Sequence, residues 1–344
     1  MGRRGKSSIV HDVKAAVNEL DRIGQSKRDL RAKGEHGIHS LKQKKETLSA
    51  AQNFAKWTRS VFGVKSVYQL KEEHYKAYMS HLEKENRSVG HRRNVETALR
   101  HLQKGMNLRS EKFGKEKHVF VPEKRLTNWR EVKKPTDRSY SREEYQKILK
   151  NVPARSRDAV MLCRELGLRV REAVRVEVQH FEKTDHGSGW KLFIENGKGI
   201  TKGGRFREVE VPKQFRADLE RMIDGKTEQE KLVPLQRDTV RRAVNEACRK
   251  TGILQKGRGL HGFRHAYSRE RVEELFKDRE ISESGRTMVD RIMTNRDKGR
   301  GADYGMVSER DKEIFRQVTE VMDQVHEEIG HGKGRWDLAA VYMR

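Results

Sequence analysis

The sequence has few cysteines, the residues that form disulfides in extracellular proteins and bind zinc in many metal sites. Two cysteines, Cys163 and Cys248, occur among 344 residues, and they lack the paired spacing of a zinc site or a disulfide framework. No apolar run approaches membrane-spanning length, and no hydrophobic segment follows the charged N-terminus. We therefore expect reduced core cysteines, no bound metal and a cytoplasmic protein.

Acidic residues are scarce relative to basic ones. The 76 lysines and arginines exceed the 51 acidic residues, which gives a net charge of +25. The excess is uneven, because residues 1–140 carry 33 basic and 16 acidic side chains. Such a balance indicates a polyanionic partner, and we expect double-stranded DNA, gripped mainly by the first part of the chain.

Apolar residues recur at helical spacing along most of the chain, which predicts a mainly α fold in two domains. A helical, DNA-binding domain is expected over residues 1–107. Residues 108–138 lose this periodicity and contain two prolines, which indicates a linker. A second, α+β domain is expected over residues 139–344, opened by a capping box at Ser141.

A helix capped by Ser88 would carry several basic residues on its outer face. The side chains expected to contact DNA phosphates are those of Arg92, Arg93, Arg100 and Lys104. An ordinary solvated face is the alternative, and the positive balance of the region favours phosphate contacts.

Strand patterns are confined to residues 190–194 and 206–211, which predict a small β-hairpin or sheet in the second domain. The connection between them, residues 197–205, is rich in glycine and carries exposed lysines. A phosphate-cradling nucleotide loop is the alternative, but the loop has no Walker pattern and no helix directly after it.

Chemistry is suggested most directly by the stretch from Leu260 to Ala266, in which His261 and Arg264 stand three residues apart. On a helix that spacing puts both side chains on one face. An imidazole can pass a proton near neutral pH, and a guanidinium matches two phosphate oxygens. The pair therefore suits a reaction at a phosphodiester, although a solvated basic turn would carry the same residues.

The order of the motifs resembles the tyrosine recombinase (phage integrase) family. The resemblance rests on Gly-Leu-Arg-x-x-Glu, a lysine in the hairpin, H-x-x-R, Gly-His and a C-terminal tyrosine. The helices before them look like the core-binding domain of that family. The resemblance assigns catalytic roles to Arg169, Lys202, His261, Arg264, His331 and Tyr342.

In the reaction that the resemblance implies, Tyr342 attacks the scissile phosphate and forms a 3′-phosphotyrosyl bond, so that religation needs no ATP. Arg169 and Arg264 would clamp the nonbridging oxygens, where charge develops in the transition state. Each role is filled by a side chain. No cofactor is therefore expected, and cleavage should survive EDTA.

The remaining three residues would handle protons and hydrogen bonds. Lys202 would protonate the departing 5′ oxygen, His261 would handle the proton of the tyrosine, and His331 would hydrogen-bond the phosphate. Lys198 competes with Lys202, and His326 competes with His331. Glu172 and His265 are expected to be structural supports.

Blander interpretations exist for two of these residues. Arg169 could merely pair with Glu172, and Tyr342 could be a core residue of a last helix. A type IB topoisomerase-like enzyme and a noncatalytic DNA-binding regulator on the same fold are the alternative functions. The family implies a dimer on each specific recombination site and a tetramer in synapsis, with an accessory DNA-bending protein as a further partner.

The segment between Arg264 and His331 is longer than is usual in the family, and its charged part, at about residues 271–310, is expected to be a surface insertion with some helix. Since the sequence stops two residues after Tyr342, we expect another element to couple the protomers. The insertion is a candidate for contacts between protomers or with DNA. A disordered loop is the alternative.

The charge distribution makes a testable prediction about residues 1–137. Expressed alone, this segment should bind duplex DNA with a steep inverse dependence on salt, because each neutralised phosphate releases counterions. The affinity should be measured by titration at several salt concentrations. An affinity that does not change with salt would contradict the prediction.

Overall fold

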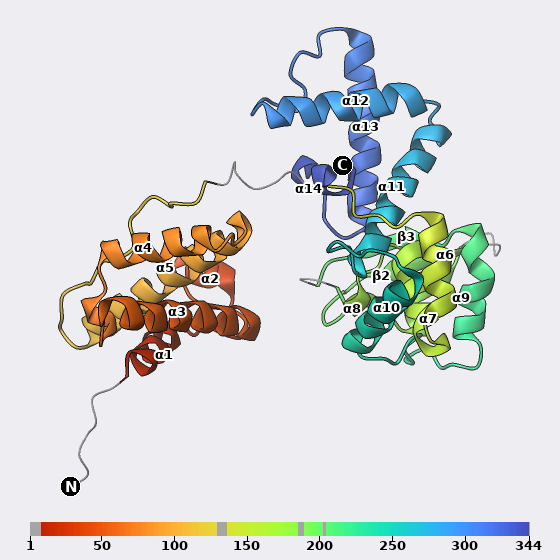
Figure 1. The fold of residues 1–344 in the computed structure, drawn as a ribbon. Coiled ribbons are helices and arrows are strands. Elements are labelled where there is room, and N and C mark those ends of the chain that lie inside the picture. Colours follow the sequence, from red (N-terminus) through yellow and green to blue (C-terminus); the bar gives the residue numbers. More distant parts are fainter. Residues whose placement is uncertain (1–7, 129–135, 185–188, 202–203, 344) are drawn as a thin grey trace. The chain divides into compact units, whose positions relative to one another are not determined.

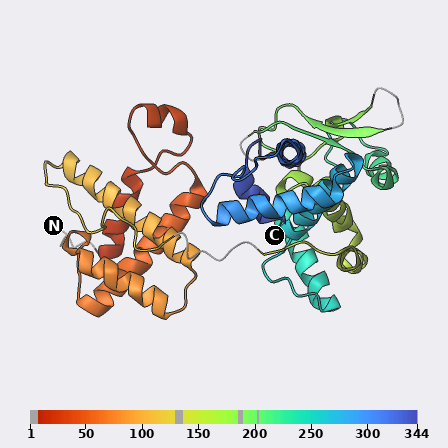
Figure 2. The ribbon, with the colours of Figure 1, turned by 90° about the horizontal axis from the view of Figure 1, so that it is seen from above.

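The computed structural model describes residues 8–128, 136–184, 189–201 and 204–343 (Figures 1 and 2). The chain divides into two compact units, Met1–Lys134 and Pro135–Arg344. Each unit has its own buried core. The mainly helical fold with a small sheet that the sequence predicts is confirmed.

The first unit is helical throughout the residues described. Ser8, Ser40 and Ser88 each accept a hydrogen bond from the backbone amide three residues later, and these caps begin its three main helices. Those helices, α1, α3 and α5, pack on one another. The elements are α1 (Ile9–Glu19), α2 (Lys27–Ala32), α3 (Leu41–Phe62), η1 (Val67–Gln69), α4 (Glu72–Lys84) and α5 (Val89–Lys112).

Part of the segment expected to be a linker, residues 108–128, packs in the first unit. Helix α5 continues to Lys112, and Phe120 is fully buried in the core of the first unit. The buried carboxylate of Glu96 accepts hydrogen bonds from the hydroxyl of Tyr75 at 2.6 Å and the backbone amide of Leu126 at 2.8 Å. The apolar periodicity of the sequence did not predict these contacts, because residues 113–128 form no helix or strand. Single side chains hold this segment against the first unit.

The second unit packs helices around a three-stranded antiparallel sheet of order β1-β2-β3. Strand β1 is too short to produce a sequence pattern, and Leu192 of β2 pairs with Val209 of β3. The first ten elements are α6 (Arg142–Asn151), α7 (Ala154–Glu165), α8 (Val170–Ala173), η3 (Val178–His180), β1 (Phe181–Lys183), β2 (Trp190–Ile194), β3 (Arg207–Glu210), η4 (Lys213–Phe215), α9 (Arg216–Ile223) and α10 (Arg237–Thr251).

Four more helices complete this unit: α11 (His261–Asp278), α12 (Ser282–Asp297), α13 (Glu309–Glu328) and α14 (Trp336–Met343). Helix α12 crosses α13, which Figure 1 shows upright and Figure 2 almost end-on. The charged segment at about residues 271–310 is therefore largely helical, and it shares a separate hydrophobic cluster with α13. Among the residues described, no helix is long and apolar enough to span a membrane.

Close packing of α1 on α5 generates a prediction about Gly105. A Cβ at this position would overlap the carbonyl oxygen of Ala16, whereas a Cβ at Gly90, in the same helix, would meet no atom within 4 Å. Gly105→Ala should therefore destabilise the first unit by roughly 1–3 kcal/mol. Gly90→Ala should cost nothing and could add up to about 1 kcal/mol, because alanine favours the helix.

Calorimetric unfolding of the full-length variants would measure both effects. Equal stabilities of the two alanine variants would show that α1 and α5 do not approach as closely as the structure has them.

Candidate active site

Arg169 lies at a tight turn between α7 and α8. Gly167 adopts a positive φ of 58°, and a Cβ there would collide with the ring of Tyr267. The turn ends in a capping interaction, in which the backbone amide of Arg169 donates to Glu172 Oε2 at 2.9 Å and its Nη1 donates to Glu172 Oε1 at 2.7 Å. The turn and the cap together orient the Arg169 side chain toward the centre of the second unit.

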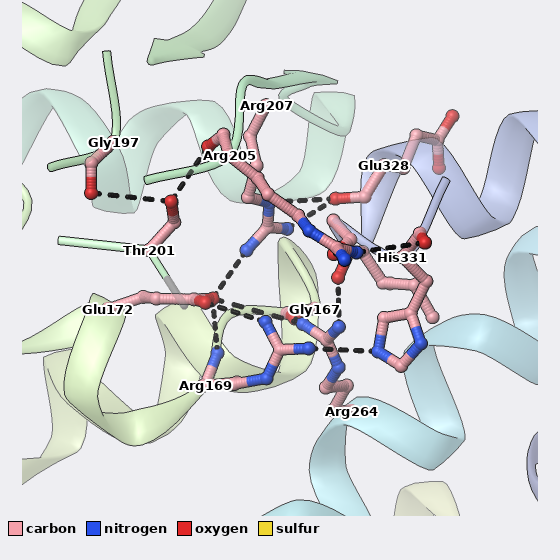
Figure 3. Close-up of polar contacts among 12 residues, drawn as sticks. Gly167, Arg169, Glu172, Gly197, Thr201, Arg205, Arg207, Arg264, Glu328 and His331 are labelled. Atoms are coloured by element: carbon pink, nitrogen blue, oxygen red, sulfur yellow. Dashed lines mark hydrogen bonds and ion pairs between the residues drawn. The ribbon is translucent and has the colours of Figure 1, made fainter. Parts of the chain in front are cut away.

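Glu172 is the buried carboxylate at the centre of this site (Figure 3). Besides Arg169, it accepts a hydrogen bond from Arg207 Nη1 at 2.6 Å and lies 3.9 Å from Arg264 Nη1. Burial by itself raises the pKa of Glu172, but the three guanidiniums lower it below its ordinary value. The carboxylate therefore stays ionised and balances part of their charge.

Arg264 is completely buried on the first turn of α11. Its Nη1 donates to the carbonyl of Gly167 at 2.6 Å, and its Nη2 donates to the carbonyl of Ile329. Burial and the nearby positive guanidiniums lower the pKa of Arg264 to about 10. The guanidinium is consequently still charged at neutral pH and is held rigidly by two backbone carbonyls.

His331 follows a glycine that ends helix α13. Gly330 has a φ of 66°, its amide donates to the carbonyl of Glu327 at 2.8 Å, and the amide of His331 donates to His326 at 2.7 Å. This is the Schellman arrangement, which favours glycine at that position. Arg205 also binds the turn, donating to the carbonyl of His331 at 2.9 Å.

The hydrogen bonds of the His331 ring define its protonation. Nη2 of Arg169 lies 2.9 Å from Nε2 of His331. Because a guanidinium can only donate, Nε2 must be the acceptor and carries no proton. Burial and the charges of Arg264 and Arg169 lower the pKa of His331, which likewise favours the neutral ring.

Tyr342 lies on α14 with its hydroxyl between two of these groups. The hydroxyl oxygen is 3.4 Å from Arg264 Nε and 3.3 Å from His331 Nε2. Arg269 of α11 donates from Nε to the carbonyl of Tyr342 at 3.0 Å, near the end of the helix. The ring of His265 packs at 4.7 Å between centroids. The tyrosine is thus held by its backbone, its ring and its hydroxyl.

His261 is the first residue of α11 and is exposed. Its ring centroid lies 6.1 Å from that of Tyr342, and within the described ranges the tyrosine hydroxyl makes its hydrogen bonds to other groups. Loss of hydration and the charges of Arg264 and Arg169 lower the pKa of His261, which keeps the ring neutral. The exposed edge retains contact with water, so the hydration effect is weaker than in a buried ring.

The structure therefore brings Arg169, Arg264, His331 and Tyr342 into one bonded group, with His261 beside it. Residues 138–285 match the model of the phage integrase family. This part of the second unit is therefore similar to that family. The match stops before His331 and Tyr342, and the geometry described above is what places these two residues beside Arg169 and Arg264.

Solved structures of family members share the fold. A XerH site-specific recombinase bound to its difH substrate before cleavage is 13% identical, with a TM-score of 0.55, over 98% of this chain and 92% of that one. A lambda integrase tetramer bound to a Holliday junction is 14% identical, with a TM-score of 0.52, over 98% and 84%. No curated protein matches this chain. At such identities the likeness concerns the fold.

Lys202 lies outside the residues that the structure describes. The hairpin beside it is described, and there Thr201 donates from its hydroxyl to the carbonyl of Arg205 at 2.7 Å. Its competitor Lys198 is exposed on the same hairpin. The role of Lys202 in this site stays a prediction.

The four basic residues expected to contact DNA differ in their surroundings. Arg92 donates to Glu83 at 2.6 Å, and Arg100 donates to the carbonyls of Pro122 and Glu123 at 2.7 and 3.0 Å. Arg93 is partly buried and Lys104 is exposed. Arg92 and Arg100 would have to share or exchange these contacts to bind phosphates, so Lys104 is the most accessible of the four.

Sequence reasoning gave no role to Arg205, Arg207 and Arg269. Arg207 is fully buried and donates from Nε to the carbonyl of Glu328 at 2.9 Å, which fixes the end of α13. The sequence did hold a signal for Arg207. It occupies a buried position of the alternating strand Arg207–Glu210, where an apolar residue is usual, so an arginine there indicates a buried ionic partner. Arg269 had no such signal, because its partners are distant in the sequence: two backbone carbonyls of α14 and the carboxylate of Asp137.

The central carboxylate makes a stability prediction. Glu172→Gln should lower the free energy of unfolding by roughly 3–5 kcal/mol, because it leaves Arg207 buried without its counter-charge. Glu246→Gln, which removes an exposed carboxylate paired with Arg249 at 2.8 Å, is the matched control and should have little effect.

The same variant should change the response to acid. The lowered pKa of Glu172 means that its carboxylate stabilises the fold above the ordinary glutamate pKa and loses this effect as the pH falls through the folded value. Chemical unfolding at a series of pH values should therefore show the gap between wild type and Glu172→Gln narrowing in acid. A gap of constant size would mean that charge is not what Glu172 supplies.

Proposed function

We propose that this chain is a site-specific DNA recombinase that uses Tyr342 as its nucleophile. The observation that carries the proposal is the position of the Tyr342 hydroxyl, 3.4 Å from Arg264 Nε and 3.3 Å from His331 Nε2. Arg169 joins the same group through its contact with His331. A tyrosine that merely filled the core would not need its hydroxyl beside two phosphate-binding groups.

In the proposed reaction the Tyr342 oxygen attacks the scissile phosphorus, and the bond from phosphorus to the 5′ oxygen breaks. The phenolic proton leaves to a neighbouring base, while Lys202 supplies a proton to the 5′ oxygen. The product is a 3′-phosphotyrosyl bond, which replaces one ester by another. Attack by a 5′ hydroxyl then reverses the step on a new strand, so that neither ATP nor metal is required.

The arginines supply the electrostatic part of the mechanism. Arg264 is held by the carbonyls of Gly167 and Ile329, and Arg169 is held by Glu172. Such fixed charges need little reorganisation when negative charge develops on the phosphoryl oxygens. Losing one contact of this kind can lower the rate by about 10²-fold.

His331, rather than His261, is within hydrogen-bond distance of the Tyr342 hydroxyl. We infer that the negative charge of a bound phosphate offsets the two arginines that lower the pKa of His331, so that His331 accepts the phenolic proton. We infer that His261, on the exposed side, contacts the incoming phosphate.

Assembly is part of the proposal. A lambda integrase tetramer bound to a Holliday junction shares this fold. We infer that the present chain also binds each recombination site as a dimer and joins two sites as a tetramer. Its net charge of +25 suits such DNA complexes.

The proposal predicts the effect of Tyr342→Phe. This variant should bind DNA nearly as wild type does but form no covalent adduct, because only the nucleophilic oxygen is removed. Adducts should be trapped in EDTA on nicked suicide duplexes drawn from DNA flanking the gene. Tyr304→Phe, which alters an exposed tyrosine of the α12–α13 connection, is the matched control.

Two results would contradict the mechanism. An adduct of undiminished yield in Tyr342→Phe would assign the nucleophile elsewhere. A wild-type reaction abolished by EDTA would show that side chains do not suffice.

A further inference from the structure

Helix α14, which carries Tyr342, packs on two separate hydrophobic cores. Tyr342 belongs to the main core of the second unit, and Leu338 and Val341 pack against that core. Ala339 belongs instead to the cluster formed by the end of α11 with α12 and α13, and Trp336 and Ala340 pack against it. Helix α14 therefore lies between the main core of the second unit and the hydrophobic cluster of α11, α12 and α13.

Specific contacts join α14 to α13. The ring of Phe315, in the second turn of α13, stacks on Trp336, the first residue of α14, with centroids 6.2 Å apart and planes inclined by 25°. Just before α14, the amide of Gly334 donates to Asp323 Oδ1 of α13 at 2.7 Å. The start of the tyrosine helix is thus held by α13, while its end is held by Arg269 of α11.

The charge of the insertion argues against a role in binding phosphate. Residues 271–310 contain nine basic and nine acidic side chains, in a chain whose net charge is +25. Several of the charges pair with carboxylates of α13, as in Arg291 with Asp311 at 2.9 Å and Arg279 with Glu320 at 2.7 Å. What the insertion offers to the rest of the unit is mainly its apolar cluster, and α14 lies against it.

We propose that α13, together with the hydrophobic cluster that it shares with α12, is an intramolecular dock that holds the tyrosine helix in its reactive position. The inference rests on the proposed role of Tyr342. Phe315 and Trp336 act as positioning residues, since neither touches the reacting atoms.

The physical basis is a two-state equilibrium of α14. The helix has eight residues, too few to be stable without packing. If the contacts of α14 with α13 and the shared cluster weaken, α14 is docked for a smaller fraction of the time. The cleavage rate then falls in proportion to that fraction. DNA binding, which depends on the basic surface of the chain, should be unaffected.

The charged segment at about residues 271–310, which includes α12, was expected to serve contacts between protomers or with DNA. If it served only contacts between protomers, it would be dispensable for cleavage at a single site. A dock for α14 is required for that cleavage, even before two sites are joined. Single-site cleavage therefore separates the two interpretations.

The test compares Phe315→Ala with Tyr304→Ala in the full-length protein. Tyr304 is an exposed aromatic residue of the connection between α12 and α13, and its ring contacts Arg300 rather than α14. Phe315→Ala should slow adduct formation on a single-site suicide duplex about tenfold or more, with an unchanged Kd for that duplex. Tyr304→Ala should match wild type, and Phe315→Tyr, which keeps the stacked ring, should restore the rate.

Hydrogen exchange gives a readout that does not depend on catalysis. Amides of residues 336–343 should exchange faster in Phe315→Ala, while those of α7 and α10 keep their protection. Trp336→Ala should resemble Phe315→Ala, and the double variant should be little worse than either single one, because the two rings act through one contact.

The outcomes separate the dock from the proposed function. If Phe315→Ala cleaves and exchanges as Tyr304→Ala does, the dock is refuted, whatever the nucleophile is. If α14 exchanges faster in Phe315→Ala but Tyr342→Phe still forms adducts, α14 is docked as described but the tyrosine has another role, and the inference falls with the proposed function.

Discussion

The second unit depends on one buried carboxylate that neutralises several guanidiniums. Glu172 receives Arg169 from its own turn, Arg207 from β3 and the approach of Arg264 from α11. At short range in a medium of low polarity, three cations without this anion would repel one another strongly. The carboxylate therefore allows a concentrated positive charge to form in the interior of a folded unit.

Arg207 and Arg264, which contact Glu172, also bind the end of α13. Arg207 donates to the carbonyl of Glu328, and Arg264 donates to that of Ile329. Both bind where the helix leaves carbonyls unpaired and where its dipole favours positive charge. His331 follows directly, so its position depends on Glu172 even though the two residues share no contact in Figure 3. The buried ion pairs thus fix the positions of Arg264 and His331, and Tyr342 of α14 contacts both residues.

Much of this arrangement could be predicted from single stretches of sequence. The serine caps, the Gly63 end of α3 and the capping box at Ser141 are local signals, and each is seen in the structure. The preference for His331 over His326 rested on the Gly-His motif of the family resemblance, and in the structure Gly330 ends α13 just before His331. Two features escaped this reasoning. Residues 113–128 pack without a periodic pattern, and α12 was expected as charged surface, since its apolar positions are diluted by charged residues.

The amino-acid sequence was enough to identify the fold class, the basic character of the first unit, and the motifs that lie in the active-site region. These properties follow from composition and from spacings of a few residues, which helical and strand geometry convert directly into faces and turns. Contacts between distant residues required the folded chain. The ring of Trp336 meets Phe315, and Arg269 meets the carbonyl of Tyr342, across a separation that no local pattern encodes. The packing of the tyrosine helix on two hydrophobic clusters was therefore decided by the tertiary structure, because only the folded chain brings both clusters to this helix.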